Sequence, residues 1–237
     1  MLAGYVPSAV TLANAGAGLI ACALAMHGRA DVGALVILAA VLLDAMDGAL
    51  ARSFGASTEF GGELDSLADV ISFGVAPAML VGSVLPSGLW AVGWVFLLAY
   101  PLCAAWRLAR FNVAHHERVR SQAEFVGLPS TGAGAAAATA LLLQARLVES
   151  GIATGHMLLP SLMLVLAALM VSRISYRHAG AIIARFSPVS AAALAALFVA
   201  GSVLWHHEYV FAALMWGYVA SGPLATAKEK LRAVRHA

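Results

Sequence analysis

Long apolar runs alternate with short polar segments along the chain, and eight of these runs are long enough to cross a bilayer. A helix needs about 20 apolar residues to span the hydrocarbon core. The pattern therefore predicts an all-α fold, a polytopic integral membrane helical bundle with about eight transmembrane helices in one domain, residues 1–237. The predicted spans are 8–27, 32–52, 65–85, 88–111, 130–148, 156–175, 187–205 and 208–227.

An acidic stretch interrupts this pattern, because residues 44–69 hold six of the chain's twelve acidic side chains. Asp44 and Asp47 are three residues apart, and Asp65 and Asp69 are four apart. Each pair therefore shares one face of a helix. Four unpaired carboxylates inside a bilayer would cost on the order of 10 kcal/mol, so their charge needs compensation. Two divalent cations, either magnesium, manganese or calcium, compensate it most simply.

Composition supports the membrane prediction and excludes other classes. The chain is 62% hydrophobic and 11% charged, whereas soluble domains contain about 25% charged residues. The net charge of +2 gives no support for nucleic-acid binding. Cys22 and Cys103 lie in apolar runs without metal-type spacing, and we interpret them as packing residues.

Lys and Arg predict the orientation, because cytoplasmic loops carry an excess of these residues. With eight spans, 12 of the 14 basic residues fall on one side, leaving Arg29 and Arg146 on the other. That side is predicted to be cytoplasmic, and it includes both termini and the open end of the acidic stretch. We therefore expect a protein of the cell (inner) membrane, surrounded by membrane lipids, with its active site facing the cytoplasm.

Two further segments leave alternatives open. The small residues of STGAGAAAATA, residues 130–140, permit close helix packing inside the monomer or a contact between two copies. RISYRHAGAIIARF, residues 173–186, is either an amphipathic helix at the interface or a basic loop.

The acidic stretch also fits a specific pattern, D-x-x-D-G-x-x-A-R-x8-G-x3-D-x3-D. Its fixed positions are Asp44, Asp47, Gly48, Ala51, Arg52, Gly61, Asp65 and Asp69. This pattern is the signature of the CDP-alcohol phosphotransferase family, which the chain resembles without a departure in the motif. The resemblance implies a homodimeric membrane enzyme that transfers a substituted phosphate from a CDP-linked donor to an alcohol and releases CMP.

The resemblance also implies roles for individual residues. Asp44, Asp47, Asp65 and Asp69 would bind two metal ions, and Asp69 would also act as the general base. Two cations can clamp both the attacking and the leaving oxygen at phosphorus. The predicted substrate-binding residues are Thr11 and Asn14 in the first helix, the motif residues Gly48, Ala51, Arg52 and Gly61, and Thr58 in the connecting turn. Close helix packing is the alternative explanation for Gly48, Ala51 and Gly61, and a hydrogen bond to a neighbouring helix is the alternative for Thr11 and Asn14.

Other segments resemble the bacterial and archaeal phosphatidylserine synthases of this family. They are GGELDSLADVISFGVAPA (61–78), RLARFNV (107–113), GLPST (127–131) and LMVSRISY (169–176). The implied reaction is direct attack by the hydroxyl of L-serine on CDP-diacylglycerol. Arg107 and Arg110 would hold the serine carboxylate or a phosphate, or else anchor their helix at the interface.

Two alternatives remain at this point. One keeps the chemistry and changes the acceptor to glycerol 3-phosphate, inositol phosphate or choline. The other is a divalent-cation transporter, whose intramembrane aspartates would bind ions in transit. A bare ion site does not explain Gly48, Ala51 and Arg52.

Overall fold

The structure is a computed structural model that describes residues 5–54, 59–117, 124–177 and 207–235. It is almost entirely helical, with one two-stranded antiparallel sheet. The long helices are α1 (Tyr5–Met26), α2 (Ala30–Phe54), α5 (Trp90–Glu117), α6 (Ser130–Glu149) and α10 (His207–Arg235). The shorter elements are α3 (Glu59–Asp69), η2 (Val70–Val75), α4 (Ala76–Ser83), η3 (Ser87–Leu89), α7 (Leu158–Val171), β1 (Glu124–Val126) and β2 (Ser175–Arg177).

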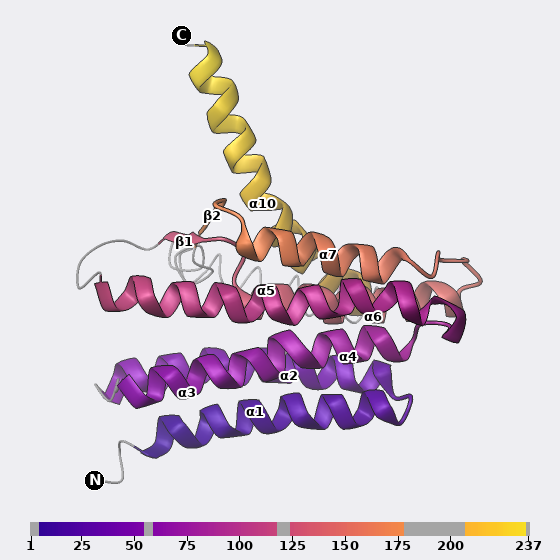
Figure 1. Cartoon of the computed structure of the whole chain (residues 1–237), viewed down its shortest axis with the longest axis horizontal. Helices are drawn as coiled ribbons and strands as arrows, with labels where there is room; N and C mark the ends of the chain where they lie inside the picture. The colour runs from indigo at the N-terminus through magenta and orange to yellow at the C-terminus, as the bar shows by residue number, and fades with distance from the viewer. Residues whose placement is uncertain (1–4, 55–58, 118–123, 178–206, 236–237) are drawn as a thin grey trace.

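Helices α1 to α7 run side by side along the long axis of the molecule, whereas the C-terminal part of α10 projects beyond them (Figure 1). Helix α1 packs on α2, α5 packs on α7, and α6 packs on both α2 and α10. The C-terminal ends of α2, α5 and α7 meet the N-terminal ends of α1, α3 and α6 at one end of the bundle (Figure 1). The alternating direction of these helices brings the described aspartates of the motif to that end (Figure 1).

Seven of the eight predicted spans coincide with helices, and the predicted span 187–205 lies outside the described residues. Four helical stretches are long and apolar enough to cross a membrane: Ser8–Met26, Phe60–Ser83, Ser130–Glu149 and Glu208–Glu229. This supports a polytopic membrane protein, while the count of eight stays a prediction. The span predicted at 156–175 is too long, because the backbone becomes extended at Ser172 and continues into β2.

One helical stretch from Glu59 to Ser83 includes the π-helix η2, which the sequence pattern did not predict. The amide of Ala76 donates to the carbonyl of Ile71, five residues earlier. Pro77 follows directly and has no amide hydrogen to continue the usual ladder. The wider turn starts immediately after Asp69, and π-helical turns occur frequently at functional sites.

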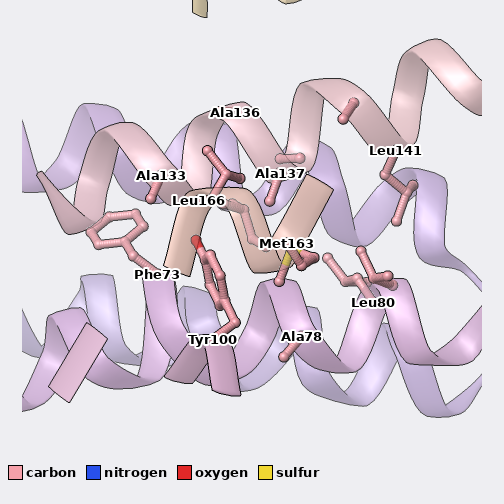
Figure 2. Packing of buried hydrophobic residues seen from close by; sticks show 14 of the residues in the cluster. Phe73, Ala78, Leu80, Tyr100, Ala133, Ala136, Ala137, Leu141, Met163 and Leu166 are labelled. Carbon is pink, nitrogen blue, oxygen red and sulfur yellow. The ribbon is translucent and has the colours of Figure 1, made fainter. Parts of the chain in front are cut away.

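The small residues of α6 are buried inside the chain, which confirms the first of the two explanations for that segment. Gly134 faces Phe73, and a Cβ atom at Gly134 would lie 2.9 Å from the Phe73 ring. Figure 2 shows Ala133, Ala136 and Ala137 in the same core cluster as Phe73. The absence of large side chains therefore lets α6 approach η2 closely.

The antiparallel strands β1 and β2 pair Phe125 with Tyr176. The segment predicted as an amphipathic helix or a basic loop therefore begins as a strand, and its residues 178–186 lie outside the described part of the chain. The Tyr176 hydroxyl donates to the carbonyl of Val219 at 3.0 Å, which attaches β2 to α10. Gly127 follows β1 with φ = 90°, a backbone conformation that favours glycine.

Candidate active site

Three of the four predicted aspartates meet at the end of the bundle. Each of Asp44, Asp65 and Asp69 places one carboxylate oxygen so that all three oxygens lie within 4.8 Å of one another. Asp44 comes from α2, whereas Asp65 and Asp69 come from successive turns of α3. Asp69 is only 6% exposed, and the other two are half-buried. The short spacings in the sequence therefore do bring carboxylates from two helices together.

Asp47 lies outside this group of three, although the sequence pattern placed all four aspartates together. Its Oδ2 atom accepts a hydrogen bond from the hydroxyl of Thr11 in α1. Its Oδ1 atom is buried and has no hydrogen-bond partner among the described residues. Asp47 thus faces α1, because residues three apart on a helix differ by about 60° in direction.

The first turn of α6 contacts two of the clustered aspartates through hydroxyl groups. Ser130 donates to Oδ2 of Asp69 at 3.0 Å, and Thr131 donates to Oδ2 of Asp44 at 3.2 Å. A helix N-terminus carries a partial positive charge, so this end of α6 also favours nearby carboxylates. The sequence pattern predicted no role for Ser130 or Thr131. Both lie in GLPST (127–131), a segment that resembles the phosphatidylserine synthases, and this resemblance is the signal that points to them.

The two arginines of α5 have different surroundings. Arg107 is 6% exposed, and its Nη1 donates to Ser130 Oγ at 2.9 Å. Arg110 donates to backbone carbonyls at the end of α7 and in β1, including Val171 at 3.0 Å and Val126 at 2.9 Å. These contacts attach the end of α5 to its neighbours. A role for either arginine in substrate binding stays a prediction.

The other predicted substrate contacts are placed less completely. Asn14 is 1% exposed, and its side-chain amide has no hydrogen-bond partner within the described ranges. The backbone carbonyl of Asn14 accepts a hydrogen bond from the Ser72 hydroxyl at 2.8 Å. Gly61 lies in the first turns of α3. Gly48, Ala51 and Arg52 lie in the last turns of α2, with side chains that are not described, and Thr58 lies outside the described residues.

The clustered carboxylates fit a divalent metal. Their oxygens are the hard donors that magnesium, manganese and calcium prefer. Oδ1 of Asp69 is buried without a hydrogen-bond partner in the described part of the chain, and such an atom normally has one. A cation held by Asp44, Asp65 and Asp69 would supply that partner and compensate the carboxylate charge.

A family model for CDP-alcohol phosphatidyltransferase matches residues 4–171, which include every described aspartate of the site. The chain belongs to the CDP-alcohol phosphatidyltransferase family.

Individual family members are similar over about half of the chain. A CDP-diacylglycerol–serine O-phosphatidyltransferase of Mycobacterium leprae is 40% identical over 139 residues, which cover 57% of this chain and 46% of the relative. The protein of the same name from Bacillus subtilis is 35% identical over 130 residues, 55% of this chain and 71% of the relative. An archaetidylserine synthase of Methanothermobacter thermautotrophicus is 37% identical over 128 residues, 52% of each chain. The chain spans about half the length of the first of these relatives.

Proposed function

We propose that this CDP-alcohol phosphatidyltransferase transfers the phosphatidyl group of CDP-diacylglycerol to the hydroxyl of L-serine and releases CMP. The observation that carries the proposal is the group of three carboxylates within 4.8 Å at one end of an apolar helical bundle. The names of the similar proteins from bacteria and archaea support serine as the acceptor.

The proposed reaction is a direct displacement at phosphorus. The serine oxygen forms a bond to the phosphorus of the phosphatidyl group, and the bond from that phosphorus to the CMP oxygen breaks. The proton of the serine hydroxyl passes to Asp69, which acts as the general base. Two divalent cations, held by Asp44, Asp47, Asp65 and Asp69, would neutralise the developing charge on the phosphate oxygens.

The buried position of Asp69 suits this role, because little water can compete with the acceptor hydroxyl for its carboxylate. Thr11 and Asn14 would contact the nucleotide from α1, with Gly48, Ala51 and Gly61 leaving room for it. Arg52, Thr58 and Arg110 are the proposed contacts to phosphate or to the serine carboxylate. The chain would form one domain, cross the cell membrane eight times with both termini in the cytoplasm, and function as a homodimer whose site faces the cytoplasm.

The test is CMP release by the purified full chain with CDP-diacylglycerol and a divalent metal. Serine, glycerol 3-phosphate, inositol phosphate and choline are supplied separately, and Asp69→Asn serves as the inactive variant. Serine-dependent release that Asp69→Asn abolishes supports the proposal. Release with another alcohol would retain the chemistry and reject serine. No release with any alcohol from folded protein would reject the enzymatic proposal.

A further inference from the structure

A hydrogen-bonded chain of three side chains, Arg107, Ser130 and Asp69, joins three helices behind the carboxylate group. Arg107 in α5 donates to Ser130 at 2.9 Å, and Ser130 in α6 donates to Asp69 in α3 at 3.0 Å. All three side chains are buried, and Ser130 is 0% exposed. Water therefore does not compete for these bonds as it would at a surface.

Elementary hydrogen-bond chemistry determines the direction of both bonds. A serine hydroxyl has one proton to donate, whereas a guanidinium can only donate. The hydroxyl oxygen of Ser130 must therefore accept from Arg107, and its single proton must point to Oδ2 of Asp69. Oδ2 is thus engaged on the side of α6. Oδ1, which has no hydrogen-bond partner among the described residues, is the oxygen that remains for a ligand.

We infer that Ser130, oriented by Arg107, is a positioning residue that fixes the Asp69 carboxylate so that its Oδ1 atom is presented to the metal or the acceptor hydroxyl. This inference rests on the proposed function and deepens it. It also gives Arg107 a role behind the carboxylate group, in place of the direct substrate contact that the sequence suggested. Hydrogen-bond partners that lie behind a metal ligand orient the groups that bind the metal.

The geometry of the segment before α6 supports this role. Gly127 has φ = 90° and packs so closely that an added Cβ would lie 2.3 Å from the carbonyl of Met170. Leu128 is fully buried, and its amide donates to the carbonyl of Leu169 at 3.0 Å. The chain leading to Ser130 is therefore held against α7, which restricts where the Ser130 hydroxyl can lie.

The first test compares Ser130→Ala with Thr139→Ala in the full-length protein. Thr139 is a matched control, because it is a fully buried hydroxyl in the same helix and donates only within that helix, to Ala136 at 3.0 Å. We expect Ser130→Ala to lower kcat for CMP release by about 10–100-fold and to raise the Kd for Mn²⁺, measured by electron paramagnetic resonance, by about 10-fold. Thr139→Ala should change neither quantity by more than about twofold.

Whether Ser130→Ala changes kcat or KM distinguishes a positioning role from a role in substrate binding. A higher KM for serine or CDP-diacylglycerol with unchanged kcat would overturn the inference, because it indicates lost ground-state binding. Unchanged kcat and unchanged Mn²⁺ affinity in Ser130→Ala would overturn it as well. If the wild-type protein releases no CMP at all, the proposed function fails, and the Mn²⁺ titration still decides whether Ser130 orients the Asp69 carboxylate.

A double-mutant cycle tests the part played by Arg107. If Arg107 acts through Ser130, adding Arg107→Gln to Ser130→Ala should reduce kcat by no more than about threefold beyond the larger single effect. Losses that multiply would show that Arg107 acts separately, and would overturn its positioning role. Arg107→Lys replaces Arg107→Gln in the cycle if the latter does not give a folded protein by size-exclusion chromatography.

Discussion

Thr11 in α1 donates a hydrogen bond to Asp47 in α2, and both side chains are buried. The pair joins residues 36 positions apart in the chain at the end of the bundle where the other aspartates lie. Hydrogen bonds to a charged group are stronger than those between neutral groups. The contact therefore both stabilises the packing of α1 on α2 and orients the fourth aspartate of the motif.

Replacing Thr11 by valine should destabilise the protein by about 1–3 kcal/mol, because Asp47 would lose a donor while staying buried. Valine has nearly the same shape, so packing is retained, and Thr11→Ser should restore most of the stability. Thermal unfolding in detergent measures the effect. Thr139→Val is the comparison, because the Thr139 hydroxyl that it removes donates only within its own helix. Equal melting temperatures for Thr11→Val and wild type would contradict the prediction.

Metal binding should reverse the effect of neutralising one clustered aspartate. Without divalent ions, Asp65→Asn should be at least as stable as wild type, because it removes repulsion between neighbouring carboxylates. With Mn²⁺ at about 100 times its Kd, the wild-type protein should gain about 2.7 kcal/mol and Asp65→Asn much less.

The matched control for this experiment is Glu149→Gln, since Glu149 is an exposed carboxylate at the far end of α6, paired with Arg146 at 2.9 Å. It should respond to Mn²⁺ and to chelator as the wild type does. Equal Mn²⁺ stabilisation of Asp65→Asn and wild type would show that Asp65 does not bind the metal.

Gly134→Ala should destabilise the fold by about 1–3 kcal/mol, because the added methyl group would overlap the Phe73 ring at 2.9 Å and its Cα at 3.2 Å. Gly217→Ala in α10 is the matched control, since no atom lies within 4 Å of its added Cβ. That variant should be neutral or up to about 1 kcal/mol more stable, because alanine favours helices over glycine. Thermal unfolding of both variants measures the difference, and equal destabilisation would contradict close packing of α6 on η2.

Tyr176 should make the stability of the protein depend on pH in the alkaline range. Burial raises the pKa of Tyr176 to about 12, with a smaller contribution from Tyr218, compared with about 10 in an unfolded chain. The stabilisation from its protonated hydroxyl is therefore complete below about pH 10 and is lost as the pH rises to about 12. Unfolding measurements on wild type and Tyr176→Phe should show a stability difference of about 1 kcal/mol at neutral pH that diminishes over this range. A difference that does not change with pH would contradict the prediction.

Much of the architecture was predictable because it depends on local composition. Apolar runs of the right length form helices in a bilayer whatever their partners are, since backbone groups must be satisfied within the segment. Seven of the predicted spans therefore agree with helical stretches in the described part of the chain, apart from their ends. The predicted end of the span at 156–175 was wrong, because strand pairing between Phe125 and Tyr176 depends on segments that are far apart in the sequence.

The candidate site also has one part that the sequence predicted and another that depends on tertiary contacts. The sequence by itself determined the family motif and predicted that all four aspartates meet, because short spacings on adjacent helices limit where carboxylates can lie. The structure confirms that meeting for Asp44, Asp65 and Asp69. Only the tertiary structure decided that Asp47 faces Thr11 and that Ser130 and Thr131 reach Asp69 and Asp44 from a distant helix. The physical reason is that the direction of a side chain around a helix follows from local spacing, whereas the group it meets depends on how separate helices pack.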